Sequence, residues 1–254
     1  MMKTGLTTNG QRTAALILCL LVVSQGHTQS VTGREDWEFL AELYLWGPEI
    51  DIENAEGTHQ EVEFSDLAEV TRGGFMGGFY VQRDKWRFGI DAIYLEADER
   101  IRAPVGEGVE LNELELEVWY VSPMVAYQIA RFDRSEFYVY GGARYLWAEP
   151  TGKFRTGDPL PPGRFQASES DGVWDGFVGV HGITRLNEKW YLAYQADVGG
   201  GDSDATYQLL GGINYRFNYF DASVGYRYMR WDLDSTLFNE IEFNGFYAGA
   251  KIFF

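Results

Sequence analysis

The chain has 254 residues, a formal net charge of −17 and an aromatic content of 16%. Such an acidic chain lacks the basic surface by which proteins commonly bind nucleic acid, and this class of partner is therefore excluded. The length suits one domain rather than two. Beyond the amino terminus no stretch approaches the ~20 apolar residues of a transmembrane helix, so any crossing of a membrane must be made by strands.

The amino terminus has the pattern of a secretory signal peptide. Lys3 and Arg12 precede an apolar run from Ala14 to Val23, and small-residue chemistry follows as far as Gly26. The run is too short to span a bilayer and is typical of the apolar region of a signal. Cleavage near Gly26 would remove Cys19, the only cysteine, and the mature chain would then have no disulfide and no thiol nucleophile.

Period-2 alternation begins at Trp37. From Trp37 to Gly47 one face carries Trp, Phe, Ala, Leu and Leu, and the other carries Glu, Leu, Glu, Tyr and Trp. Successive strand side chains point to opposite faces, so this pattern predicts a strand with one lipid-compatible face. The clearest alternation is ELELEVWY from Glu113, which places the glutamates opposite Leu, Leu, Val and Tyr120.

Ten strands follow from this pattern, most near the ~9–11 residues that a tilted membrane strand needs. We predict them at Trp37–Gly47, Arg72–Gln82, Trp86–Asp98, from about Glu113, and at Glu136–Glu149, Val173–Thr184, Lys189–Gly199, Ala205–Phe217, Phe220–Trp231 and Ile241–Phe254.

The last strand reads IEFNGFYAGAKIFF, and its apolar face carries Phe246, Ala248, Ala250, Ile252 and Phe254. From Trp37 onward the chain resembles bacterial outer-membrane β-barrel proteins of the OmpA-like and OmpW-like kind. These proteins characteristically end in such a strand with a final phenylalanine, which the barrel-assembly machinery reads. Many of them carry Tyr two positions before the end, where this chain has Ile252. The resemblance implies compartment and fold, and it implies the barrel-assembly signal Phe246, Ile252 and Phe254.

The predicted connections alternate between short and long, as expected for short periplasmic turns and long external loops. Seven tryptophans, all but Trp119, lie near a predicted strand end, as interfacial aromatic belts require. Eight strands remain as an alternative, and so do twelve if residues 50–64 form a separate hairpin. A soluble lipocalin-like barrel is a further alternative, but its apolar residues would face inward and it gives no reason for the belts.

The predicted inward face collects charges of both signs. An isolated charge inside a narrow barrel is costly, so carboxylates and guanidiniums there should pair and fill the lumen. The alternative is a narrow, cation-preferring pore lined by excess carboxylate. The pore-lining or salt-bridge candidates are Glu38, Glu42, Asp91, Glu115, Glu117, Arg144, Asp197, Arg216 and Arg227, with Arg87 and Asp221 on the same face.

Residues 48–71 hold eight acids and no Lys or Arg. As an external loop this acidic stretch could collect divalent cations that bridge lipopolysaccharide phosphates, because oxygen ligands suit calcium and magnesium. A solvated acidic loop explains the same composition. We expect outer-membrane lipid, lipopolysaccharide and the barrel-assembly machinery as partners.

An enzyme would need a histidine beside a hydroxyl or carboxylate. His59 lies in the acidic stretch, and His181 is followed by Thr184, whereas the deacylases that this barrel might resemble place Ser two residues after His. The sequence therefore predicts no catalytic residue, no cofactor and no metal centre.

These observations predict an all-β chain that forms a single antiparallel transmembrane β-barrel in the outer membrane of a Gram-negative bacterium. The expected role is non-enzymatic, structural or surface-exposed, through acidic external loops. A narrow cation-preferring passive pore and a lipid-modifying enzyme are the alternatives. The expected division of the chain is signal peptide 1–26, short N-terminal segment 27–36 and β-barrel 37–254.

Overall fold

The computed structural model describes residues 36–54, 59–62, 71–100, 103–168, 170–233 and 238–254. All of these belong to one compact unit. The predicted signal peptide lies outside the described residues. Within the described part of the chain, no helix is long or apolar enough to cross a membrane.

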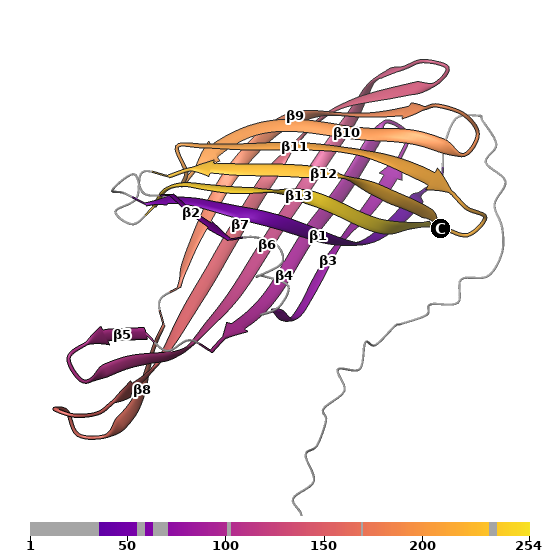
Figure 1. The fold of residues 1–254 in the computed structure, drawn as a ribbon. Helices are drawn as coiled ribbons and strands as arrows, with labels where there is room; N and C mark the ends of the chain where they lie inside the picture. The colour runs from indigo at the N-terminus through magenta and orange to yellow at the C-terminus, as the bar shows by residue number, and fades with distance from the viewer. Residues whose placement is uncertain (1–35, 55–58, 63–70, 101–102, 169, 234–237) are drawn as a thin grey trace, which may run out of the picture. The chain divides into compact units, whose positions relative to one another are not determined.

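The described residues form thirteen strands in one antiparallel sheet (Figure 1). The strands are β1 Glu38–Asn54, β2 His59–Val62, β3 Thr71–Arg83, β4 Trp86–Glu99, β5 Ala103–Gly106, β6 Val109–Arg131, β7 Ser135–Thr156, β8 Gly163–Ser168, β9 Asp171–Arg185, β10 Trp190–Gly201, β11 Ala205–Arg216, β12 Asp221–Asp232 and β13 Phe238–Phe253.

Ten of these strands close into a barrel in the order β1, β3, β4, β6, β7, β9, β10, β11, β12 and β13. The first and last strands pair with each other, and Phe39 and Phe254 exchange two backbone hydrogen bonds of 3.0 Å. Closure leaves none of these ten strands with a free edge along its spanning length. The predicted fold class and the predicted ten spanning strands are confirmed.

Three short strands lie outside the ring. β2 pairs with the end of β1, from Ile50 opposite Val62 to Glu53 opposite His59. β1 and β2 therefore pair within residues 50–64, where the sequence allowed a separate hairpin. This pairing adds no spanning strand, because β1 also continues to pair with β13. β5 and β8 pair with the extended ends of β6 and β7, in segments that the sequence predicts as connections between strands.

The two ends of the barrel differ in their connections. One end, called the inner end here, carries the tight turns after β3, β6, β9 and β11 together with Phe254. The other, the outer end, carries the long connections, β2, β5 and β8, and one short connection between β10 and β11 (Figure 1). Short turns mark the periplasmic side of outer-membrane barrels, so the outer end faces outward from the cell.

Glycines serve two purposes in the wall. A Cβ on Gly89 would lie 2.2 Å from the ring of Tyr80, so this glycine makes room for an inward aromatic side chain. A Cβ on Gly142 would lie 2.1 Å from the backbone oxygen of Pro123, so here the two strands approach closely and the wall coils.

Candidate functional site

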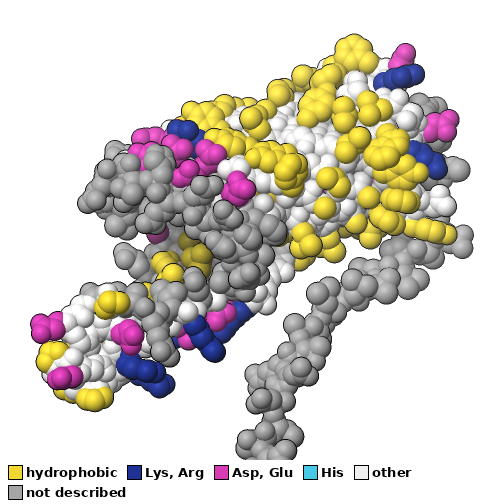
Figure 2. Space-filling model, in the orientation of Figure 1, with side chains coloured by type: hydrophobic (Ala, Val, Ile, Leu, Met, Phe, Trp, Pro, Cys, Tyr) yellow, Lys and Arg dark blue, Asp and Glu magenta, His cyan; other side chains and the backbone are white. Residues whose placement is uncertain are grey.

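The wall of the barrel is apolar outside and mixed inside. On β1, Leu43 and Leu45 are 58% and 79% exposed, whereas Trp46, on the other face of the same strand, is 6% exposed. On β13, Phe246 is 74% exposed and its neighbour Tyr247 is buried. Figure 2 shows apolar side chains over the barrel wall, with acidic side chains gathered towards the outer end. A barrel with apolar residues outside and polar ones inside is built for lipid, and a soluble barrel would show the reverse.

Arg227 on β12 is the centre of the first polar contact across the lumen. Its guanidinium donates to Asp91 at 2.9 Å, to Tyr44 at 3.0 Å and to Gln208 at 2.8 Å. Tyr44 in turn donates to Asp91 at 2.7 Å. The Arg227 side chain is only 4% exposed. Side chains from β1, β4, β11 and β12 thus meet at one buried ion pair.

Arg144 on β7 is the centre of the second contact. Its guanidinium pairs with Asp197, and both side chains are fully buried. Asp197 also accepts from Tyr140 at 2.5 Å and from Gln208 at 3.0 Å. Gln208 therefore joins the two ion pairs into one network that reaches six strands of the ring. We call Tyr44, Asp91, Tyr140, Arg144, Asp197, Gln208 and Arg227 the lumen network.

An apolar cluster lies in the lumen on the outer side of this network. It contains Trp46, Ile93, Tyr120, Met229, Trp231 and Tyr247, all buried. Arg227 lies between two of these rings, with its guanidinium carbon 5.1 Å from the centre of Trp46 and 5.3 Å from that of Tyr120. Cation–π contact and packing thus hold the network against the cluster.

Further polar pairs fill the inner side. The Nζ of Lys251 lies 3.5 Å from the Oε1 of Glu42. Tyr191 donates to Asp221 at 2.8 Å. Arg87 donates to Gln82. The lumen therefore holds paired polar side chains below the network as well as within it.

The structure brings together most of the predicted lumen residues. Asp91, Arg144, Asp197 and Arg227 form the lumen network, and Glu42 pairs with Lys251. Arg216 pairs with Asp221 at 3.6 Å near the inner end. Glu38 begins β1, opposite Gln82.

Sequence reasoning missed Tyr44, Tyr140 and Gln208, which complete the lumen network. Tyr44 could have been found, because it shares the inward face of its strand with Glu42. Gln208 shares no such signal, because only the register of β11 against β10 and β12 brings it to both ion pairs.

The prediction that Glu115 and Glu117 face the lumen is wrong. β6 runs without a bulge through this segment against β4, and Tyr120 on the other face is buried inside. Glu117 therefore shares the outward face with Trp119, whose indole N–H donates to it at 3.0 Å. Glu115 accepts from Lys153 at 2.5 Å on the same face. Each carboxylate thus has a hydrogen-bond donor on the outward face and needs no partner in the lumen.

Tryptophans divide between belt and lumen. Trp119 packs against Tyr94 with ring centres 4.5 Å apart, and both lie on the outward face. Trp46 and Trp231 are buried in the lumen cluster instead. Trp46 and Trp231 were predicted in the aromatic belts and Trp119 was not, because nearness to a strand end does not reveal which face a tryptophan occupies.

Acidic side chains gather at two places on the outer end of the wall, here called the acidic rim. Glu117 is flanked in register by Glu96 and Glu149, and on the opposite side of the barrel Asp51 and Glu53 face Glu242 and Glu240. Like charges directly opposite each other are destabilising. Burial raises the pKa of Glu240, and the carboxylates of Asp232, Glu242 and Glu53 add to the rise, against the effect of Arg230. The acidic stretch 48–71, predicted as a loop, is partly strand: residues 48–54 belong to β1 and residues 59–62 form β2. Residues 55–58 and 63–70 lie outside the described residues.

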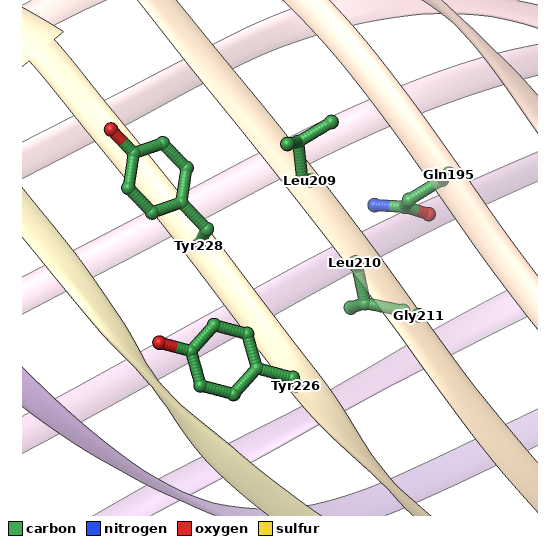
Figure 3. Close-up of a pocket in the computed structure, with 6 residues that line it drawn as sticks. All are labelled: Gln195, Leu209, Leu210, Gly211, Tyr226 and Tyr228. Atoms are coloured by element: carbon green, nitrogen blue, oxygen red, sulfur yellow. The ribbon is translucent and has the colours of Figure 1, made fainter.

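A hollow of about 460 Å³ lies on the wall at β10 to β12, lined by Gln195, Leu209, Leu210, Gly211, Tyr226 and Tyr228 (Figure 3). Leu209 and Tyr226 are exposed on the outward face. A Cβ added at Gly211 would have no other atom within 4 Å, so the wall is open at this position. Leu210, which also lines the hollow, packs against the lumen cluster, so the hollow lies between side chains of both faces of the wall.

Comparison with known proteins finds barrels. No protein-family model matches the chain, and no curated protein matches it. Among solved structures, it is similar to the translocator domain of the autotransporter NalP from Neisseria meningitidis at 14% identity and TM-score 0.42, covering 85% of this chain and 88% of that one. It is also similar to Neisserial surface protein A, at 13% identity and TM-score 0.33, covering 85% and 96%. A third is Ail of Yersinia pestis in complex with a heparin analogue, at 10% identity and TM-score 0.38, covering 86% and 98%.

The chain is a β-barrel of the outer-membrane type. Its own geometry carries this assignment. Ten antiparallel strands close into a ring, the outward wall is apolar with aromatic pairs, and the inward face is polar.

Proposed function

We propose that this protein is a non-enzymatic, non-conducting barrel that acts at the cell surface through the elements of its outer end. The lumen network is the observation that supports it. Two arginines and two aspartates balance in charge, and the network joins six of the ten strands across the interior. Any ion that passed would have to separate buried pairs, which is costly because the freed charges would be left uncompensated.

The alternative is the narrow cation-preferring pore. It requires carboxylates in excess along the lumen, as in charged constriction rings. The carboxylates of Glu42, Asp91, Asp197 and Asp221 each have a cationic partner within 4.0 Å. Glu115 and Glu117, the two glutamates most prominent in the sequence pattern, face outward. A closed barrel therefore fits these positions better than a pore does.

A catalytic role is disfavoured by the orientation of the histidine. His181 points inward, where its Nε2 lies 3.1 Å from Arg87, and Thr184 belongs to the outward face, where it contacts Ser135 and Tyr194. A nucleophile and its base must lie within hydrogen-bond reach. These two side chains point to opposite faces of the same strand. The side chain of His59 lies outside the described residues.

The outer end offers two surfaces. The acidic rim would meet lipopolysaccharide, whose phosphates are also negative, and divalent cations would then bridge the two because both supply oxygen ligands. Beyond the rim, β5 to β8 extend the wall outward. We propose the rim as the contact with lipid and this extension as the contact with external partners. Phe246, Ile252 and Phe254 on the outward face of the last strand would be read by the barrel-assembly machinery.

Single-channel recording tests the proposal. Mature protein refolded into a planar bilayer should show no conductance steps, at low or at high salt. An Arg144→Ala/Arg227→Ala variant, which removes both cations of the lumen network, should conduct and so prove that insertion is detected. Arg72→Ala/Arg230→Ala removes two arginines from the outer surface of the wall and should remain silent. Cation-preferring steps from the unaltered protein would refute the proposal and restore the pore.

A further inference from the structure

The outer end carries a small sheet that continues the barrel wall. β5, the first residues of β6, the last residues of β7 and β8 form it, at the lower left of Figure 1. The order of the whole sheet ends with β5 on one side and with β8 on the other. Among the described residues, each of these two strands therefore has one edge with no strand beside it.

The two edges differ in their protection. β5 is four residues long, contains Pro104, and shifts register between Pro104 and Gly106. Short length, proline and irregular register are the devices by which natural proteins block unwanted strand pairing. β8 is two residues longer and has neither proline nor a register shift. Its six residues, GRFQAS, pair with β7 in unbroken register from Gly163 to Ser168, and all six are exposed.

One face of the β7–β8 pair carries two unpaired arginines. Arg155 and Arg164 are directly opposite each other in register, and both are exposed. Within the described part of the chain neither forms an ion pair, whereas the nearby Lys153 is engaged by Glu113 and Glu115. Like charges directly opposite destabilise a strand pair. A chain of net charge −17 thus places two guanidiniums without an ion-pair partner beside the free edge of β8.

The other face is aromatic. Phe154 and Phe165 stack with ring centres 4.9 Å apart and planes 14° from parallel. Phe165 is nevertheless 49% exposed, because it lies on the last strand. A strand added beside β8 would therefore meet positive charge on one face and an apolar ring on the other.

We propose that the free edge of β8 binds an extended peptide segment of a partner protein by strand addition, with carboxylate side chains towards Arg155 and Arg164 and apolar side chains towards Phe165. Main-chain hydrogen bonds supply affinity in this mode of recognition, and alternate side chains supply specificity. The proposal rests on the surface role proposed above and names its partner. A second copy of this chain fits less well, because antiparallel pairing of β8 with itself would bring four arginines together.

Fluorescence polarisation tests this proposal with the mature protein in detergent micelles. The probe is a short fluorescein-labelled peptide of alternating glutamate and valine with blocked ends. It should bind, and an Arg155→Gln/Arg164→Gln variant should bind it about tenfold more weakly through loss of charge-assisted hydrogen bonds. Arg131→Gln/Arg185→Gln, which changes two half-exposed arginines near the inner turns, should bind as the unaltered protein does.

Two further probes separate strand addition from simple charge attraction. The same peptide with every backbone nitrogen methylated keeps its carboxylates but cannot donate to β8, and it should not bind. A lysine–valine peptide should not bind either. Equal binding of the methylated peptide, equal binding by the Arg155→Gln/Arg164→Gln variant, or no binding of the first probe would overturn the proposal. Conductance is measured separately, so a silent bilayer would leave the surface role standing.

Discussion

Replacement of Arg227 by methionine is the most informative change to the lumen network. The side chain is 4% exposed and donates to Asp91, Tyr44 and Gln208. Its removal leaves the Asp91 carboxylate, itself 16% exposed, without its cation. Breaking a buried pair from one side typically costs about 3–5 kcal/mol, and we expect Arg227→Met to destabilise the barrel by that amount.

The double variant Arg227→Met/Asp91→Leu should recover much of this loss. A buried ion pair replaced on both sides by apolar groups of similar volume is often neutral, because no uncompensated charge remains. Arg230→Met is the matched control. Its guanidinium contacts Asp232 at 2.7 Å, but its side chain is 36% exposed, so we expect a cost of less than about 1 kcal/mol.

Urea unfolding in phospholipid vesicles, followed by tryptophan fluorescence, measures these differences as shifts in midpoint at constant slope. If Arg227→Met costs no more than Arg230→Met, the buried ion pair of Arg227 with Asp91 does not stabilise the barrel. Failure of the double variant to recover stability would show that packing, and not the uncompensated carboxylate, causes the loss.

Three other perturbations test separate parts of the account. Glu115→Gln/Glu117→Gln should leave the bilayer current unchanged at zero in single-channel recording, because both side chains face outward; a change in current would return them to the lumen. Gly142→Ala should lower the free energy of unfolding in urea by an amount typical of overpacking, about 1–3 kcal/mol, since its Cβ would strike the backbone oxygen of Pro123. Gly211→Ala, with nothing within 4 Å of its Cβ, should be neutral, and equal effects would refute the close approach. The pKa of Glu240 is raised in the folded protein, so ionising this carboxyl costs stability; the cost is absent below the unfolded pKa and grows as the pH rises through the folded pKa. Glu240→Gln should therefore flatten the fall of melting temperature with rising pH above about pH 4. An unchanged slope would contradict a raised pKa for Glu240.

The sequence predicted the ring of strands well because the membrane imposes a simple rule. Where lipid lies on one side, alternate residues must be apolar, so Leu43 and Leu45 identify their face without any knowledge of the fold. The final strand, with Phe246 outward and Tyr247 inward, follows the same rule.

The rule fails at the outer end, and there the sequence misled. The glutamates of β6 alternate as clearly as any residues in the chain, but they face outward near the rim while Leu116 and Val118 share the face of the buried Tyr120. Residues nearer the inner end of β6 indicate that the glutamates face outward. Trp119 and Val125 lie an even number of residues from Glu117, so they share its face, and both are exposed on the outside of the wall. Which charges meet inside is set by strand register, and so the pairing of Arg227 with Asp91 required the structure.

Closure of the lumen is the central claim, and cysteine accessibility tests it most directly. Residues 27–254 contain no cysteine, so single substitutions report one site each. Ser122→Cys lies beside Asp91 in register and Ser223→Cys lies nearer the inner end, and both serines are buried, at 7% and 2% exposure. In the refolded barrel a charged methanethiosulfonate reagent should leave both unmodified, while Gln166→Cys on β8 reacts at once. Rapid modification of Ser122→Cys and Ser223→Cys in the folded protein would show a continuous wet path through the barrel and contradict the account.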